Sequence, residues 1–385
     1  IDWEIRSFHG EEYSTHRGTS YNSYLIKEEK TALIDTVWKP FAQEFVRNLE
    51  QEIDLKDIDY IIANHAETDH SGAMPELMRL IPDTPVYCTS NGLKSLKGHY
   101  HQDWNFKVVK TGDKLSLGQK ELVFVEAPML HWPDTMFEYL TGDAVLFSND
   151  AFGQHIASEH IFNDLVPEPE LFEEAVKYYA NILTPFSPMV ARKINEIVGL
   201  NLPLNTICPS HGVVWRDNPL QIVQKYQKWA ADYQENQITI VYDTMWDGTR
   251  KVAEYIAKGV KQENDKVTIK VYNIARSDIN DVVTEIFKSG MLLLGSPTIN
   301  RGILSAMSAL LEMISGLKFK SKKAAAFGCY GWSGESVAIL NDRLTKAGFE
   351  IVDDGLKTLW EPGDDELVQA VEYGRKIANT FGMKD

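Results

Sequence analysis

The sequence lacks the features that mark membrane and secreted proteins. It has no apolar run of 18 residues or more, so a membrane-spanning helix is not expected. The first residues, 1–6, carry acids and no apolar run, which argues against a secretory signal peptide. The three cysteines, Cys88, Cys208 and Cys329, are too few and too widely spaced for a disulfide framework or a Cys-x-x-Cys metal site. Each is interpreted as a small buried hydrophobic residue, and the protein is predicted to be cytoplasmic.

The chain also lacks positive charge. Its formal net charge of −16 argues against nucleic acid as a partner, because the phosphates would be repelled. A hydrophobic content of 44% with 11% aromatic residues is typical of a folded globular protein. Since 385 residues is long for one hydrophobic core, two domains are expected.

The order of the predicted elements changes near residue 236, which divides the chain into predicted domains 1–235 and 236–385, with a hinge at 229–237. In the first domain, short strands alternate irregularly with helices, which predicts packed sheets with helices outside. These strands are expected at 24–26, 32–34, 60–63, 85–87, 122–125 and 144–147. In the second domain, five strands alternate regularly with five helices, which predicts a doubly wound parallel sheet. The strands are expected at 238–242, 267–272, 291–294, 324–327 and 349–353, and the helices at 250–262, 281–288, 303–314, 335–347 and 365–380.

Four potential metal ligands follow the apolar strand at 60–63, before a helix expected to begin near Ser71. They are His65, Glu67, Asp69 and His70. In an extended segment the first three share one side, and His70 points elsewhere, which suits a second metal. Further ligands must come from distant segments, and three strand ends offer them: His131, Asp150 and His211. The alternative is four exposed polar residues in an ordinary loop.

These motifs resemble the metallo-β-lactamase superfamily, whose fold is an αββα sandwich. That superfamily usually has His at the position of Glu67. The Glu variant, with Leu-His-Trp-Pro-Asp at 130–134 and Asn-Asp-Ala-Phe-Gly at 149–153, closely resembles the flavodiiron proteins. The resemblance implies two irons, the first held by His65, Glu67 and His131, the second by Asp69, His70 and His211, with Asp150 as the bridge. A carboxylate, being a harder ligand than imidazole, favours iron over zinc.

Some residues near this motif keep two interpretations. Asp35 lies where the superfamily has an acid that orders the loops, and it could equally be an ordinary turn residue. Roles next to the metal site stay open for Tyr13, His16, Trp132 and His155.

The second domain contains three loops at predicted strand ends, where a ligand of this fold binds. Hydroxyl groups and backbone N–H groups at a helix N-terminus form a phosphate cradle, and glycines let the backbone approach a ring. The flavodoxin pattern Thr-x-Thr-Gly-x-Thr is altered here, because Trp and Asp replace its middle Thr and Gly, but the altered loop is similar to that of flavodiiron proteins. Tyr330 or Trp332 could stack on the ring or could pack in the core. With no Gly-x-Gly-x-x-Gly after a strand, FMN is expected rather than a dinucleotide. The candidate FMN-binding residues are Thr244, Met245, Trp246, Asp247, Gly248, Thr249, Ser296, Pro297, Thr298, Asn300, Tyr330, Gly331, Trp332, Ser333 and Gly334.

The resemblance implies an oxidoreductase that reduces dioxygen to water, nitric oxide to nitrous oxide, or both. Two ferrous ions and a reduced flavin together hold four electrons, the number that one dioxygen needs. The sequence contains no Cys-x-x-Cys pair of the kind that would indicate a rubredoxin module. A separate donor is therefore expected: rubredoxin, ferredoxin or a reduced deazaflavin coenzyme. The family also implies a head-to-tail homodimer or a dimer of dimers. The rival interpretations are a zinc hydrolase of the same superfamily and a flavin-binding electron shuttle or sensor. The sequence does not decide which gas or which donor is used, or between dimer and tetramer.

Overall fold

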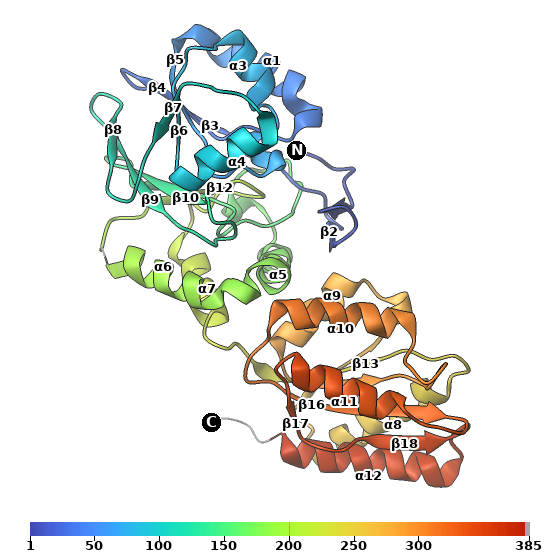
Figure 1. Ribbon diagram of the computed structural model, residues 1–385. Helices are drawn as coiled ribbons and strands as arrows, with labels where there is room; N and C mark the ends of the chain where they lie inside the picture. Colours follow the sequence, from blue (N-terminus) through green and yellow to red (C-terminus); the bar gives the residue numbers. More distant parts are fainter. Residues whose placement is uncertain (200, 382–385) are drawn as a thin grey trace. The chain divides into compact units, whose positions relative to one another are not determined.

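The computed structural model describes residues 1–199 and 201–381 (Figure 1). The chain packs into two compact units. The first comprises residues 1–179 and 186–230, and the second comprises residues 180–185 and 231–385. In the described part of the chain, no helix is long and apolar enough to cross a membrane.

The first unit contains two five-stranded sheets that face each other. One has the order β3-β4-β5-β6-β7 and the other the order β12-β11-β10-β9-β8, and a short hairpin, β1-β2, precedes them. Buried side chains of both sheets form one core, in which Ile34 and Ile62 meet Phe124 and Met136. The strands are β1 Ser7–Phe8, β2 Tyr13–Ser14, β3 Tyr24–Ile26, β4 Thr31–Ile34, β5 Ile58–Ile62, β6 Val86–Cys88, β7 Phe106–Val108, β8 Lys114–Ser116, β9 Glu121–Glu126, β10 Met136–Leu140, β11 Val145–Asn149 and β12 Thr206–Pro209.

Helices cover the outer faces of these two sheets, α1, α3 and α4 on one side and α5, α6 and α7 on the other (Figure 1). The sequence favours this placement because each helix has one apolar face; in α1, for example, Phe45, Val46 and Leu49 are buried. The arrangement is the αββα sandwich that the resemblance implies. The helices are α1 Ala42–Glu52, α2 Thr68–Ser71, α3 Met74–Leu80, α4 Ser90–Tyr100, α5 Glu168–Tyr178, α6 Ser187–Gly199 and α7 Leu220–Trp229, with short helical turns η1 Lys39–Phe41, η2 Leu55–Asp57 and η3 Asn163–Leu165. Two further short helical turns, η4 Tyr179–Leu183 and η5 Thr184–Phe186, consist mainly of residues 180–185, which belong to the second unit.

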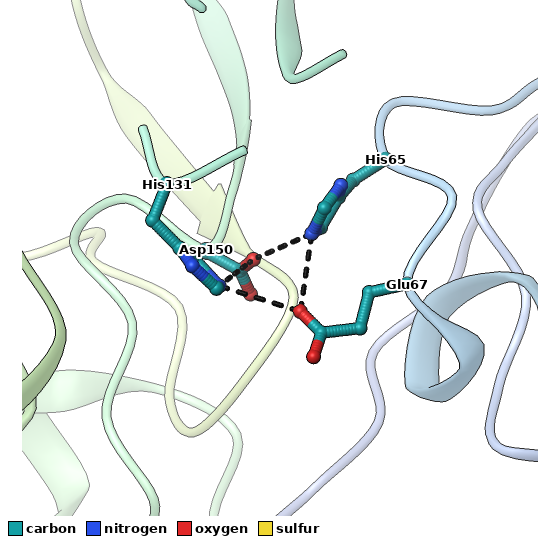
Figure 2. A group of neighbouring side chains, drawn as sticks. All are labelled: His65, Glu67, His131 and Asp150. Carbon is teal, nitrogen blue, oxygen red and sulfur yellow. Dashed lines mark hydrogen bonds and ion pairs between the residues drawn. The ribbon is translucent and has the colours of Figure 1, made fainter. Parts of the chain in front are cut away.

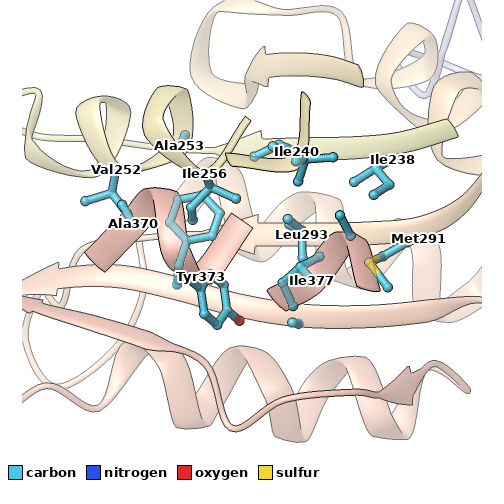
Figure 3. Packing of buried hydrophobic residues seen from close by; sticks show 14 of the residues in the cluster. Ile238, Ile240, Val252, Ala253, Ile256, Met291, Leu293, Ala370, Tyr373 and Ile377 are labelled. Carbon is cyan, nitrogen blue, oxygen red and sulfur yellow. The ribbon is translucent and has the colours of Figure 1, made fainter. Parts of the chain in front are cut away.

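The second unit is a doubly wound parallel sheet with the order β14-β13-β15-β16-β17, so the predicted fold class is confirmed. Apolar residues of β13 and β15, such as Ile240 and Leu293, pack against Ile256 of α8 and Ile377 of α12 (Figure 3). The elements are β13 Glu235–Tyr242, α8 Gly248–Glu263, β14 Thr268–Asn273, η6 Ile274–Arg276, α9 Ile279–Lys288, β15 Ser289–Gly295, α10 Ser305–Leu317, β16 Lys323–Tyr330, α11 Ser336–Lys346, β17 Glu350–Ile351, β18 Leu356–Leu359 and α12 Asp364–Thr380.

The fifth strand of this sheet differs from the prediction. A continuous strand at 349–353 was expected, but β17 has two residues and β18 then continues the pairing with β16. A turn separates them, in which Gly355 has a φ of 102° and donates its N–H to the Asp353 carboxylate. Glycine adopts this backbone conformation without steric cost, so the chain can leave the sheet and return to it.

Candidate functional site

The structure brings all seven predicted metal ligands together in the first unit, although they come from segments far apart in the sequence. Two groups form, and within each group one potential ligand atom per residue lies within 4.8 Å of the others. The first group is His65, Glu67, His131 and Asp150 (Figure 2), and the second is Asp69, His70 and His211.

Asp150 lies between the two groups. Its Oδ2 is 3.7 Å from Nε2 of His65 and 3.5 Å from Nε2 of His131. Its Oδ1 is 3.0 Å from Nε2 of His70 and 3.5 Å from Nε2 of His211. One oxygen of a single carboxylate therefore faces each group, which is the geometry of a bridging ligand.

A helix start separates the ligands that the local sequence crowds together. Helix α2 begins at Thr68, with Glu67 as the preceding residue, so Asp69 and His70 lie in a helical turn. The prediction from an extended segment, that His65, Glu67 and Asp69 share one side, is therefore wrong. Asp69 instead points to the second group, where its Oδ2 lies 3.1 Å from Nε2 of His211.

The site has the chemistry that a pair of cations needs. Among the described residues, three buried ligand atoms of the site lack a well-formed hydrogen bond: Oδ1 of Asp69, Nε2 of His70 and Oδ2 of Asp150. Such atoms are costly unless a metal or water satisfies them. The donors are imidazole nitrogens and carboxylate oxygens, a set that suits non-haem iron.

Neighbouring carboxylates raise the pKa values of buried histidines in this site. Burial opposes charging of His65, but Asp134 and Glu67 outweigh it and raise its pKa to about 10. Burial likewise opposes charging of His70, while Asp150 and Asp69 raise its pKa to about 10. Carboxylates therefore stabilise positive charge at these positions, and bound cations would replace the protons.

Several residues that the sequence analysis did not single out support the ligands. Nδ1 of His65 lies 3.3 Å from Oδ1 of Asp134, and the other oxygen of Asp134 accepts a hydrogen bond from the N–H of Ala66 at 2.8 Å. Nδ1 of His211 donates to the Ser20 carbonyl at 2.7 Å. These bonds direct Nε2 of each ring towards the site. Asp134 could have been found from the sequence, because it is the last residue of the motif at 130–134.

His9 is a second residue that the sequence reasoning missed. It comes from the turn between β1 and β2, and its Nδ1 lies 3.3 Å from Oε1 of Glu67. Oε2 of Glu67 faces the first group, 3.2 Å from His65 Nε2 and 3.4 Å from His131 Nε2. No local pattern marks His9, because only the tertiary fold brings this turn to the site.

Asp35 orders the loops of the site. It is buried with a φ of 53°, and its carboxylate accepts a hydrogen bond from the Asn64 N–H at 2.8 Å and from Asn149 Nδ2 at 3.2 Å. Asn64 precedes His65, and Asn149 precedes Asp150. The interpretation of Asp35 as a loop-ordering acid therefore fits better than that of an ordinary turn residue.

The four residues whose roles were left open lie at different distances from the ligands. The Trp132 ring packs edge-on against His65 at 4.9 Å. His155 is buried, hydrogen-bonded to Thr19, and its ring centroid lies 4.7 Å from that of His211. Tyr13 is buried against His155 at 5.1 Å, whereas His16 is exposed.

The second unit has a pocket of about 430 Å³ at the carboxyl ends of its strands, where the flavin loops were predicted. Among the described side chains, the buried hydroxyls of Thr244 and Thr249 have no hydrogen-bond partner there. Helix α8 begins beside them at Gly248, and its N-terminal N–H groups favour an anion such as phosphate. The predicted residues that line the pocket are Thr244, Met245, Trp246, Gly248, Thr249, Pro297, Thr298, Tyr330, Gly331 and Trp332.

Five candidate residues of the flavin loops do not line this pocket; they are Asp247, Ser296, Asn300, Ser333 and Gly334. Some of them shape the loops instead. Asp247 adopts a left-handed conformation and pairs with Arg250 at 3.0 Å. The Ser296 hydroxyl is buried and hydrogen-bonds within its own loop.

The tryptophans of the pocket are exposed, whereas Tyr330 is half-buried. Trp246 is 89% and Trp332 is 86% exposed, so core packing of Trp332 is excluded. Trp360 also lines the pocket and lies 6.2 Å from Trp332. The sequence reasoning missed Trp360 because it placed the fifth strand at 349–353, whereas β18 ends directly before this residue.

Comparisons with known proteins agree with this division of the chain. Residues 19–212 match the family described as ODP family beta lactamase, and residues 240–374 match Flavodoxin. The chain is 58% identical over 384 residues to the anaerobic nitric oxide reductase flavorubredoxin of Escherichia coli O1:K1 / APEC, covering 99% of this chain and 80% of that protein. The structure is similar to rubredoxin oxygen:oxidoreductase from Desulfovibrio gigas, with a TM-score of 0.95, 38% identity and coverage of 99% and 95%. It is also similar to the flavodiiron protein from Giardia intestinalis, with a TM-score of 0.94, 30% identity and coverage of 99% and 93%.

Proposed function

Because the chain belongs to the flavodiiron protein family, we propose that it is an oxidoreductase that reduces nitric oxide to nitrous oxide, dioxygen to water, or both. The observation that carries the proposal is the placement of Asp150, whose two oxygens face two separate groups of ligands. A hydrolase could use such a centre, but it would not need the flavodoxin domain attached to it.

We assign the first iron to His65, Glu67 and His131 and the second iron to Asp69, His70 and His211, with Asp150 as the bridge. When bound, a ferrous pair would supply binding positions and electrons for the gas, and FMN would supply the site's replacement electrons. The protein orients the ligands: Asp134 and the Ser20 carbonyl hold two imidazole rings, and Asp35 holds the strand ends. Burial of His65, His70 and Asp150 excludes bulk water from the site.

We assign FMN to the pocket of the second unit. The hydroxyls of Thr244 and Thr249 and the N-terminus of α8 suit its phosphate. The loops at Pro297 and Gly331 border the rest of the pocket, with Trp332 at its rim. Of the candidate residues outside the pocket, Asp247 and Ser296 are assigned to the shape of these loops, and FMN contacts of Asn300, Ser333 and Gly334 remain predictions.

The domain boundary at 235–236 stays a prediction, although the second compact unit resumes nearby, at Ala231. We further propose a rubredoxin-type electron donor, which the name of the Desulfovibrio gigas relative, rubredoxin oxygen:oxidoreductase, supports. Three further points remain predictions: that the donor is a separate protein, that the chain forms a head-to-tail homodimer, and that it is cytoplasmic.

An anaerobic titration of the reduced, iron- and FMN-loaded protein tests the function. Nitric oxide and dioxygen are added in separate experiments, and flavin absorbance and gas consumption are followed. We expect turnover with at least one gas. Nitric oxide is tested first, because the relative at 58% identity is named as a reductase of that gas. A reduced protein that consumes neither gas, or one that retains zinc in place of iron after reconstitution, contradicts the proposal.

A further inference from the structure

The interior of the first unit contains an acid that the proposed function does not use. Glu138 lies in the middle of β10 and is 0% exposed. Its side chain points to the same face as those of Met136 and Leu140, which belong to the core between the two sheets. Across the sheet it pairs with Phe124 on β9 and Phe147 on β11. A carboxyl group thus lies among apolar residues.

The polar neighbours of Glu138 belong to the segments that carry the metal ligands. Burial raises the pKa of Glu138 well above its ordinary value, the charge of Asp35 raises it further, and hydrogen bonding with the Asn64 amide opposes the rise. Burial raises the pKa of Asp35 to about 6, opposed by His70 and by the two groups that donate to its carboxylate. Burial and the charge of Asp35 therefore favour the protonated form of Glu138, whereas the groups that donate to Asp35 favour its charged form.

Unsatisfied polar atoms gather in this region. Within the described part of the chain, five buried side-chain atoms here have no well-formed hydrogen bond: both oxygens of Glu138, both polar atoms of the Asn64 amide, and Oδ1 of Asn149. A neutral carboxylic acid has one donor and one carbonyl acceptor, which match the acceptor and the donor of a primary amide. An ionised Glu138 would leave Oδ1 of Asn64 without a donor.

Asn64 connects this pair to the metal site. Its N–H donates to Asp35, and its carbonyl accepts a hydrogen bond from the N–H of Met136 on β10 at 3.0 Å. The next residue is His65. Asp35 in turn accepts from Asn149, the residue before Asp150. Movement of the Asn64 side chain would therefore disturb the strand ends that place one ligand and the bridge.

We propose that Glu138 is a positioning residue for the metal centre: as a neutral acid it pairs with the Asn64 amide and so fixes the ends of β5 and β11. This inference rests on the proposed iron site and adds a residue that acts on it from the core. The role assigned to Glu138 is to position the segments that carry the ligands, and not to bind metal or substrate.

Two variants separate this role from simple packing. Glu138→Gln keeps the shape and still offers both a donor and an acceptor to the Asn64 amide, and is expected to bind ferrous iron with the affinity of the unaltered protein. Glu138→Leu leaves the buried Asn64 amide without this partner and is expected to be less stable to urea. Its iron affinity, measured by competition with a chelator, is expected to fall by up to about 10-fold, the lower end of the effect of groups bonded directly to metal ligands. A Leu variant with unchanged iron affinity overturns the proposal.

An infrared measurement tests the protonation of Glu138 without iron or gas. In metal-free protein labelled with ¹³C-glutamate, the spectrum at neutral pH is expected to contain a protonated-carboxyl band that is absent from Glu138→Gln. If both spectra are the same, Glu138 is ionised and the proposal fails. A failure of the proposed gas reduction would leave this band unchanged, so the two outcomes can be told apart, and the measurement remains decisive if the Leu variant does not fold.

Discussion

Asp134 shows how one residue outside the ligand set can control the metal site. One oxygen lies 3.3 Å from Nδ1 of His65, and the other accepts from the N–H of Ala66. Burial raises the pKa of Asp134, but His65 and the N–H of Ala66 outweigh it, so the carboxyl is held below its usual pKa range. The charged form therefore fixes both the ring and the backbone of the ligand loop.

We predict that Asp134→Asn lowers the affinity for iron about 10- to 100-fold, because the amide removes the negative charge that holds the His65 ring. Chelator competition measures the change. The matched control is Asp164→Asn, which breaks a surface ion pair with Arg216 and is expected to leave iron affinity unaltered. Equal affinities in the two variants would contradict the role of Asp134.

Lys322 is a buried lysine directly before β16. Its Nζ donates to the carbonyls of Phe287 at 2.7 Å, Ser289 at 2.6 Å and Tyr233 at 3.2 Å. Burial lowers its pKa to about 7, although Asp232 and Glu235 oppose the shift. Since the pKa of an unfolded lysine is about 10.4, the unfolded chain binds more protons between these two values, and stability should rise with pH in that window.

We predict that Lys322→Met removes this pH dependence. Urea unfolding at pH 7, 8 and 9 should show the stability of the unaltered protein rising relative to the variant, by up to about 1.4 kcal/mol per pH unit. Lys323→Met changes the neighbouring, half-buried lysine and should keep the pH dependence. A constant difference between Lys322→Met and the unaltered protein would show that the ammonium stays charged throughout.

At the scale of elements, strand ends decide where the sites form. Strands β5, β11 and β12 each end just before a ligand, His65, Asp150 or His211. Apolar runs of this length predict strands well because their residues are buried on both faces. The sequence predicts a helix that begins near Ser71, whereas α2 begins at Thr68. Because of this difference, Asp69 lies in a helical turn and not in an extended segment, and it points away from the side that His65 and Glu67 share.

Helices α8 and α12 pack closely on one face of the second sheet, and two glycines allow it. A Cβ atom on Gly259 would overlap the carbonyl oxygen of Val371, and one on Gly374 would overlap that of Ile256. We predict that Gly259→Ala destabilises the second unit by about 1–3 kcal/mol, because backbone atoms must move apart. Calorimetry of the full chain measures the shift.

Gly316 provides the control for this prediction. It lies in α10, where an added Cβ would meet no atom within 4 Å. Gly316→Ala should therefore stabilise the protein by about 0.5–1 kcal/mol through the better helix propensity of alanine. If both substitutions had the same sign, close helix packing would not be the cause of the Gly259 effect.

At the scale of the whole molecule, the iron site and the flavin pocket belong to different compact units. The exposed rings of Trp246 and Trp332 at the pocket rim offer an apolar surface for another chain. Both observations are compatible with the proposed head-to-tail homodimer, in which the flavin of one subunit serves the irons of the other.

Complementation between two inactive variants tests this arrangement. His211→Asn removes a ligand of the second iron, and Thr249→Val weakens FMN binding; each variant is expected to be inactive alone. Co-expressed, they should regain about a quarter of normal turnover, because half of the dimers are mixed and each mixed dimer has one complete pair of sites. If mixing restores nothing while mixed dimers form, electrons pass within one chain and the arrangement is wrong.

Local properties of the sequence, namely strand length, helix periodicity and turn residues, determined the doubly wound class of the second domain and packed sheets with outer helices for the first. The αββα class of the first domain came from the resemblance of its motifs to the metallo-β-lactamase superfamily. All seven candidate ligands also came from the sequence, because they lie in segments that follow predicted apolar strands. Only the tertiary structure decided how Asp150 divides its oxygens between two groups, and that His9, Asp134 and Trp360 reach the sites. Only the tertiary structure likewise showed that the Asn64 amide, which lacks a well-formed hydrogen bond, lies beside Glu138. Contacts between residues far apart in the sequence depend on how the elements pack, and no local pattern records that packing.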